Sequence, residues 1–294
     1  MPELPEVQTT VDGLNRTVRG KTIMTAWLDW LKAIPGLKKS ETLTQRMTGR
    51  RILGASRRGK NIFIDLDGDE TLHVHLKMTG HLLYGRWHMA DGRWRATTPG
   101  PLRDDPGNSF IRLMITFADK TQLALCDMRR FAKIALYPTQ GLEDSREFAL
   151  LGPDPLSPSF TIKLFSKILF SPTRRPIKQF LLDQTKIAGI GNIYSDEMLW
   201  RAGIHPRRLP GSLSLVETRR LHAAMQKVLR KGIGMGGDSD IDFRNIDGER
   251  GHFQETHRAY RRNGKPCGKR GCPGLITRIV IGGRSSHFCP AHQK

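Results

Sequence analysis

The chain has 294 residues, of which 38% are hydrophobic and 26% are charged, and 48 Lys and Arg oppose 28 Asp and Glu. This globular balance excludes a disordered chain, the length favours two domains that each bury a core, and no apolar stretch is long enough for a membrane helix. The formal net charge of +20 is balanced by solvent or by a polyanionic partner, and nucleic acid is the first candidate. Because the N-terminus lacks a signal-peptide pattern, we expect a soluble intracellular protein.

The N-terminal half predicts a helix followed by an antiparallel β unit. Apolar residues recur at helical spacing from Val7 to Val18, with Pro5 at the start, so we expect an amphipathic helix over residues 6–18. Short apolar runs bounded by Gly, Asp or Pro follow, which is typical of a sandwich or barrel. These runs are 61–66, 72–76, 111–117 and 123–126. Residues 85–108, rich in Arg, Pro, Gly and Trp, are predicted to form a long surface loop.

The pattern becomes helical after the turn cluster Leu151-Gly-Pro-Asp-Pro, which places a domain boundary near residue 150. Helices are expected over 162–170, 177–183, 193–201 and 215–231. Residues 232–251 contain six glycines and no apolar periodicity, which predicts a mobile loop. We therefore divide the chain into three segments, 1–150, 151–255 and 256–294.

The last segment has the composition of a small metal-stabilised module. It carries nine basic residues and no acid, so a solvated basic tail is the alternative. Four cysteines in a long chain without a secretion signal favour metal binding over disulfides. The spacing Cys267-x4-Cys272, sixteen residues, then Cys289-x2-His292 is compatible with one tetrahedral structural zinc ion. His287 competes as the fourth ligand, but Cys289-x2-His292 better fits the turn of a zinc knuckle.

The N-terminus carries a second candidate chemistry. Pro2 is small enough to allow removal of Met1, which leaves a secondary amine beside Glu3 and Glu6. A free α-amino group has a reference pKa of about 7.7–8.0, so part of it is neutral at physiological pH and can act as a nucleophile. Taken alone, these residues favour an ordinary chain start over a nucleophile.

Five motifs, in order, resemble the formamidopyrimidine-DNA glycosylase and endonuclease VIII family. They are Met1 to Val7, His75 to Gly80, Asp127 to Phe131, Leu151 to Leu156 and Asp183 to Tyr194. The resemblance extends over nearly the whole chain and is closer to the formamidopyrimidine branch, chiefly through Asp127-Met-Arg-Arg-Phe131 and the glycine-rich loop. It implies a two-domain α+β fold. An N-terminal antiparallel β-sandwich with flanking helices would precede a helix-two-turn-helix domain with a zinc-finger β-hairpin.

The resemblance also implies a bifunctional DNA glycosylase and AP lyase of base excision repair, acting on oxidised purines such as 8-oxoguanine and formamidopyrimidines. Pro2 would attack C1′ and expel the base, Glu3 would protonate the sugar ring oxygen, and the resulting iminium would drive β- and δ-elimination. Lys60 matches a lysine that contacts phosphate and assists proton transfer, and Glu6 is assigned to DNA binding. Residues 232–251 would recognise the lesion. An endonuclease VIII-like preference for oxidised pyrimidines and a non-catalytic damaged-DNA-binding protein are the alternatives.

Further residues are assigned to DNA held around an extruded nucleotide. The family trio that fills the vacated space matches Met78, Arg129 and Phe131. Asn192 would bind the backbone at a helix N-terminus with Lys178 nearby, and Arg284 matches an arginine at the finger tip that holds the lesion phosphate. The expected partner is double-stranded DNA, bound by a monomer in the bacterial cytoplasm or nucleoid.

The chain departs from the family's pattern at several positions. Ala132 stands where the family usually has glycine, and Asn108 stands about where relatives place a phosphate-contacting histidine. The first cysteine gap is longer than usual, and His292 replaces the usual fourth cysteine. Cys126 lies in a predicted strand, where we expect a buried structural thiol.

Overall fold

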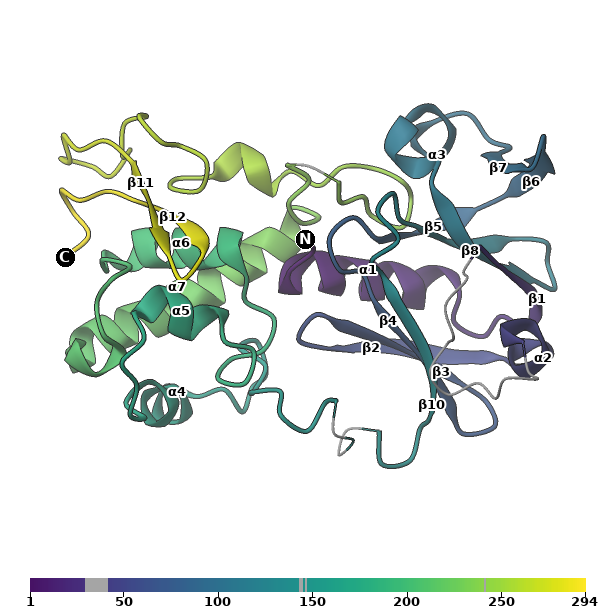
Figure 1. The fold of residues 1–294 in the computed structure, drawn as a ribbon, viewed down its shortest axis with the longest axis horizontal. Helices are drawn as coiled ribbons and strands as arrows, with labels where there is room; N and C mark the ends of the chain where they lie inside the picture. Colours follow the sequence, from purple (N-terminus) through teal and green to yellow (C-terminus); the bar gives the residue numbers. More distant parts are fainter. Residues whose placement is uncertain (30–41, 143–144, 146, 241) are drawn as a thin grey trace. The chain divides into compact units, whose positions relative to one another are not determined.

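The structure, a computed structural model, describes residues 1–29, 42–142, 145, 147–240 and 242–294. They form two compact units, a first unit of Met1–Ala149 with Met235–His252 and a second unit of Leu150–Gly234 with Phe253–Lys294 (Figure 1). The glycine-rich segment after the longest helix is thus part of the first unit. Within the described residues, none of the helices has the length and apolar character needed to cross a membrane.

The first unit is a β-sandwich with an N-terminal helix. Helix α1 (Leu4–Thr17) precedes two four-stranded antiparallel sheets. One sheet has the order β1 (Ile23–Leu28), β8 (Ile111–Phe117), β9 (Gln122–Cys126) and β5 (His81–Gly85). The other has the order β10 (Lys133–Pro138), β4 (Glu70–His75), β3 (Asn61–Leu66) and β2 (Ile52–Arg58), and the short helix α2 (Leu43–Met47) lies between β1 and β2 in the chain. Buried apolar side chains from both sheets and from α1 form one continuous core, as the α+β sandwich prediction requires.

The predicted surface loop over residues 85–108 instead contains ordered elements. They are β6 (Trp87–Ala90), β7 (Arg93–Ala96), α3 (Pro101–Asp104) and η1 (Pro106–Asn108). The turn residues Asp91 and Gly92 both have positive φ, at 51° and 72°, which is the geometry of a tight two-residue hairpin. Trp87 and Ala96 are buried in a small second core of this unit. The loop prediction was wrong because it weighed overall composition above this Asp-Gly turn.

The glycine-rich segment 235–252 is bonded to the first unit at several points. The backbone N–H of Tyr84 donates to the carbonyl of Ile246 at 2.7 Å. Arg244 is 7% exposed on its side chain and its Nε donates to Asp105 Oδ2 at 2.6 Å. Residue 241 lies outside the described residues. The part of this segment near Arg244 and Ile246 is therefore docked against the sandwich.

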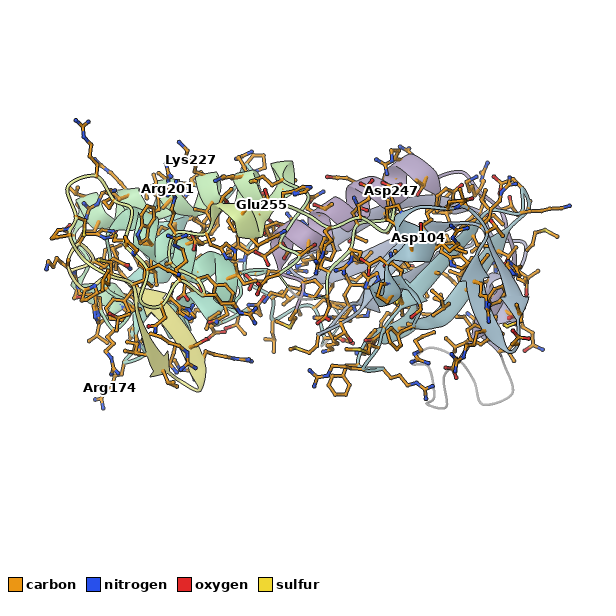
Figure 2. All side chains as sticks on the ribbon, turned by 90° about the horizontal axis from the view of Figure 1, so that it is seen from above. Asp104, Arg174, Arg201, Lys227, Asp247 and Glu255 are labelled. Atoms are coloured by element: carbon orange, nitrogen blue, oxygen red, sulfur yellow. The ribbon has the colours of Figure 1, made fainter. Side chains whose placement is uncertain are left out.

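The second unit is mainly helical. Its elements are α4 (Ile162–Leu169), α5 (Ile177–Leu182), α6 (Asn192–Ala202), η2 (Pro210–Ser212), α7 (Leu215–Gly234), η3 (Phe253–Thr256), β11 (Thr277–Ile281) and β12 (Arg284–Phe288). Each of the four predicted helical runs overlaps one of these helices, and α6 and α7 extend beyond the runs that predicted them. Helix α6 packs against α5, α7 and strand β12. Exposed basic side chains such as Arg174 and Lys227 extend away from the ribbon (Figure 2).

Candidate functional site

The start of α1 organises the predicted nucleophile. Pro2 is buried and Glu3 is 3% exposed. Glu3 is the N-cap of the helix, and Oε2 of Glu6 accepts a hydrogen bond from the Glu3 backbone N–H at 2.7 Å. A carboxylate in the first turn is also stabilised by the helix dipole. Glu6 therefore fixes the backbone immediately after Pro2.

Glu6 also bonds to the glycine-rich segment. Its Oε1 accepts from the backbone N–H of Asp238 at 2.7 Å. Gly237, with φ of 86°, lets the backbone of this segment approach the Glu6 side chain, since a Cβ at this position would lie 3.0 Å from Glu6 Oε1. Because Glu6 is 1% exposed and both carboxylate oxygens accept backbone N–H groups, the structure gives it a positioning role. Direct DNA contact by Glu6 stays a prediction.

Lys60 lies in the turn between β2 and β3 and is 7% exposed. The preceding strand reaches α1, because Arg57 Nε donates to Gln8 Oε1 at 2.6 Å. This places the Lys60 turn on the strands that pack against α1. Burial, followed by the positive charges of Lys77 and Lys60, lowers the pKa of His75 to about 3. His75 is therefore a neutral imidazole near the Lys60 ammonium.

The three predicted void-filling side chains are at the surface. Met78 is 38% exposed and Phe131 is 50% exposed, which excludes the reading of either one as a core residue. The guanidinium of Arg129 lies over the Phe131 ring, 4.5 Å from its centroid. A cation stacked on an aromatic ring presents a flat, polar-edged surface on which a nucleobase can stack.

Asp127 holds the loop that carries Arg129 and Phe131. Its fully buried carboxylate accepts from the hydroxyl of Thr79 and from the backbone N–H of Ala132, the latter at 2.7 Å. The Thr79 bond joins this loop to the turn that carries Met78. Ala132 has no positive φ, so alanine fits where the family usually has glycine. The sequence reading included Asp127 in a motif but gave it no role.

Asn108 is buried rather than available to a phosphate. It is 1% exposed, and its Nδ2 donates to the carbonyls of Pro101 at 2.8 Å and Gly248 at 3.1 Å. Its Oδ1 lies 3.0 Å from His81 Nε2. Burial lowers the pKa of His81 to about 4, so a neutral His81 donates this bond. Asn108 therefore fastens the glycine-rich segment to the sandwich.

In the second unit, Asn192 and Arg284 lie at neighbouring positions. Asn192 is the first residue of α6, and its Nδ2 donates to Ser285 Oγ on β12 at 3.4 Å. Asn192 Oδ1 is buried without a hydrogen-bond partner in the described part of the chain. Arg284 is exposed at the start of β12, next to Ser285. A helix N-terminus beside a guanidinium is suited to binding a phosphate.

Lys178 requires a correction to its expected role. Its side chain is fully buried, and Nζ donates to Asn192 O at 2.9 Å, Ser195 Oγ at 2.7 Å and Asp196 Oδ1 at 2.6 Å. Those bonds use the three protons of the ammonium, so a phosphate cannot reach it in this arrangement. Lys178 instead positions Asn192 by holding the first turn of α6.

Asp196 was missed by the sequence reading and forms the centre of this network. Its Oδ2 accepts from both the backbone N–H and Nδ1 of His287, at 2.9 and 3.0 Å, and its Oδ1 accepts from Ser286 at 3.0 Å. Asp196 thereby joins α6 to the β12 strand that carries Arg284. The available signal was an acidic pair, Asp196 and Glu197, in a strongly basic half of the chain.

The cysteine-bearing tail gathers four potential metal ligands. The ligand atoms of Cys267, Cys272, Cys289 and His292 all lie within 4.8 Å of one another. His292 Nδ1 is 3.1 Å from Cys267 Sγ, and its Nε2 is 3.0 Å from the carbonyl of Trp200. Burial opposes ionisation of Cys289, but hydrogen bonds from His292 outweigh it and lower the pKa of Cys289 to about 7.

These donors fit a structural zinc ion. Three thiolates and one imidazole satisfy tetrahedral zinc, and a hydrogen bond from the far nitrogen of the imidazole is the usual way to orient such a ligand. The Trp200 carbonyl accepts that bond from His292. The competing ligand His287 is bonded to Asp196 instead. The cluster can therefore hold a metal, and its geometry favours His292 over His287.

Two family models match the chain. Residues 1–134 match the formamidopyrimidine-DNA glycosylase N-terminal domain, and residues 151–243 match the formamidopyrimidine-DNA glycosylase H2TH domain. The chain belongs to the formamidopyrimidine-DNA glycosylase family. The resemblance read from the five motifs is thus confirmed, as is the two-domain α+β fold.

Individual members of the formamidopyrimidine-DNA glycosylase family agree over full length. A formamidopyrimidine-DNA glycosylase of Cereibacter sphaeroides is 39% identical over 296 residues, and one of Heliobacterium modesticaldum is 38% identical over 297 residues, each covering 100% of both chains. Among solved structures, a Lactococcus lactis Fpg mutant in complex with DNA that contains Fapy-dG has a TM-score of 0.84 at 31% identity, covering 100% of both chains. The Lactococcus lactis Fpg in complex with DNA that contains an abasic site has a TM-score of 0.83 at 31% identity, covering 99% of both chains.

Proposed function

We propose that this chain is a bifunctional DNA glycosylase and AP lyase of base excision repair, which removes oxidised purines from double-stranded DNA. The glycosylase class follows from the family. Relatives named formamidopyrimidine-DNA glycosylase align over the full length, and the similar structures hold DNA with Fapy-dG or an abasic site. The observation that carries the residue-level proposal is the arrangement of Pro2, Glu3 and Glu6 at the start of α1.

In the proposed reaction, the neutral nitrogen of Pro2 attacks C1′ and the bond from C1′ to the base breaks, its electron pair leaving with the base. The proton that the Pro2 nitrogen loses on forming this bond neutralises the departing base. Glu3 gives its proton to the sugar ring oxygen, which opens the ring and leaves an iminium between Pro2 and C1′. A proton then passes from C2′ to water, and the electrons of that bond, drawn towards the iminium, expel the 3′ phosphate. Loss of a second proton, from C4′ to water, expels the 5′ phosphate. Attack needs a free Pro2 nitrogen, which means that Met1 must be removed.

The remaining predicted residues hold the DNA in this proposal. Met78, Arg129 and Phe131, exposed on one surface of the sandwich, occupy the space that the extruded nucleotide leaves. Asn192 and Arg284 bind backbone phosphates, and their shared contact with β12 supports a common target. Lys60 binds phosphate near the reacting sugar.

A structural zinc ion in the tail completes the proposal. Cys267, Cys272, Cys289 and His292 would hold it. When bound, zinc supplies folding free energy to this small segment. The segment then presents Arg284 on a stable hairpin.

The test is a strand-nicking assay on two duplexes, one with 8-oxoguanine and one with an abasic site. We expect the wild-type protein to nick both, and Glu3→Gln to lose base excision by about 10²–10⁴-fold while losing less of its abasic nicking. Pro2→Gly should keep some lyase activity through its primary amine. Binding without any nicking would favour the non-catalytic alternative, and a panel of single lesions on which oxidised pyrimidines are preferred would favour the endonuclease VIII-like one.

A further inference from the structure

A cavity of about 680 Å³ opens in the first unit beside the β6–β7 hairpin. Its volume is within the range of cavities that bind small molecules. The lining residues that matter here are Trp27, Asp29, Arg93, Trp94, Arg95 and Arg112. They come from the end of β1, from β7 and from β8. None of them has a role in the function proposed above.

Two tryptophans form the aromatic part of this cavity. The ring centroids of Trp27 and Trp94 are 5.8 Å apart, with an interplanar angle of 71°. In an edge-to-face pair the edge of one ring meets one face of the other, so the pair itself does not cover the faces of the first ring. Trp27 is 37% exposed, which is high for so large an apolar residue. Open indole faces are stacking surfaces for nucleobases, whatever the base.

The charged part of the cavity is positive. The side chain of Arg93 forms no hydrogen bond or ion pair with any residue that the structure describes; its backbone pairs with Ala90 in the hairpin. Among the same residues, the side chain of Arg95 makes only an exposed ion pair with Asp91 at 3.2 Å, a contact that contributes little and exchanges readily for another anion. Among the described residues that line the cavity, three arginines outnumber the one acidic residue, Asp29, so the lining has an excess of positive charge. Guanidinium groups beside aromatic rings suit the phosphate and base of one nucleotide.

The cavity adjoins the loop that carries Arg129 and Phe131. Asp29 Oδ2 accepts from Arg112 Nη1 at 2.8 Å and from Arg130 Nη2 at 3.0 Å. Arg112 Nε also donates to the backbone carbonyl of Asp127 at 3.0 Å. Hydrogen bonds of Asp29 and Arg112 therefore connect the wall of the cavity to the loop that carries Arg129 and Phe131.

We infer that this cavity receives one unstacked nucleotide from the DNA strand opposite the lesion, and this inference rests on the proposed function. In that function, Arg129 and Phe131 meet the base that has lost its partner, which places the opposite strand next to the cavity. A side chain wedged into a duplex unstacks the neighbouring step, so a base becomes available there. Its ring stacks on Trp27 or Trp94, and its phosphate pairs with Arg93.

The test combines base removal in the DNA with side-chain removal in the protein. A duplex that carries a stable abasic-site analogue is prepared in a series, each member lacking one further base at a different position of the opposite strand. Dissociation constants are measured at fixed salt for the wild type, Trp94→Ala, Trp94→Phe and Arg93→Ala. Arg19→Ala is the matched charge control, because Arg19 is exposed in the same unit and distant in sequence from the hairpin.

We expect one position of the opposite strand at which removing the base weakens binding by the wild type about tenfold. Removing the same base should not weaken binding by Trp94→Ala any further, because that variant has already lost the stacking contact. Trp94→Phe should restore most of that sensitivity, since it keeps an aromatic face. Arg93→Ala should weaken binding to every duplex and lower the salt slope by about one unit more than Arg19→Ala does. The inference would be overturned if, at every position, the loss of binding free energy from base removal added to the loss from Trp94→Ala.

A free nucleotide is the other source of the same chemistry. Titration with deoxyadenosine monophosphate, followed by tryptophan fluorescence, should show no saturation that depends on Trp94. Saturable binding lost in Trp94→Ala, together with additive effects on the duplex series, would assign the cavity to a free nucleotide instead. Failure of the proposed function is recognised separately, because in that case the wild type does not nick the abasic duplex.

Discussion

The buried ion pair between Lys178 and Asp196 should contribute strongly to the stability of the second unit. Both side chains are 0% exposed and their nearest atoms are 2.6 Å apart. Asp196→Ala leaves the ammonium of Lys178 buried without its carboxylate, a change that costs about 3–5 kcal/mol. For a unit of this size, each kcal/mol shifts the unfolding midpoint by roughly 3–5 °C. We therefore expect Asp196→Ala to lower the midpoint of this unit by roughly 10–20 °C.

Differential scanning calorimetry with zinc present can follow the two units as separate transitions, since a two-domain chain need not unfold in one step. Arg175→Ala is the control, because Arg175 makes a 3.4 Å ion pair with Asp183 and is 67% exposed on its side chain; its shift should stay below about 2 °C. The double variant Lys178→Met with Asp196→Leu should lose less stability than the two single changes summed. An Asp196→Ala midpoint within about 2 °C of the wild type would refute the reasoning.

Three further predictions concern the chemistry, the metal and the DNA contacts. The mature protein should begin at Pro2 and be trapped on an abasic duplex by borohydride, whereas an active protein whose mass includes Met1 would contradict the nucleophile assignment. Elemental analysis should find one zinc ion per chain in the wild type and in His287→Ala, and none in His292→Ala. Zinc retained in His292→Ala would refute the ligand set. Arg284→Ala should weaken binding to DNA of every sequence and flatten the slope of the log binding constant against log salt concentration by about one unit. Arg129→Ala should instead alter the preference for the base opposite the lesion. Equal effects of the two variants on that preference would contradict the division of roles.

Local periodicity was enough to predict most of the fold. The apolar spacing from Val7 to Val18 predicted α1, and alternating runs predicted strands such as β3 and β8. Such patterns work because one face of each element is buried in the same core. The β6–β7 hairpin was missed because each of its strands is only four residues long and β6, Trp87–Ala90, shows no alternation of buried and exposed positions.

The surroundings of single charged residues could not be predicted in the same way. Lys178 lies in a basic region, and a lysine there is normally a surface residue. Its burial depends on Asp196, which is 18 positions further along the chain and on another helix. No spacing rule connects two residues on different helices. The sequence could name Lys178 as a basic residue near the expected phosphate site, but only the folded arrangement distinguishes an internal positioning role from a contact with DNA.

Glu6 illustrates how the two sources of information combine. The sequence places a carboxylate next to Pro2, and the structure shows that this one side chain bonds to the backbone at Glu3 and at Asp238. If the glycine-rich segment shifts at Asp238, either the hydrogen bond between Asp238 and Glu6 breaks or the Glu6 side chain moves with the segment. Because the other oxygen of Glu6 holds the N-cap of α1, the geometry of the nucleophile depends on where that segment lies. A buried carboxylate thus links the segment expected to recognise the lesion to the residue expected to attack it.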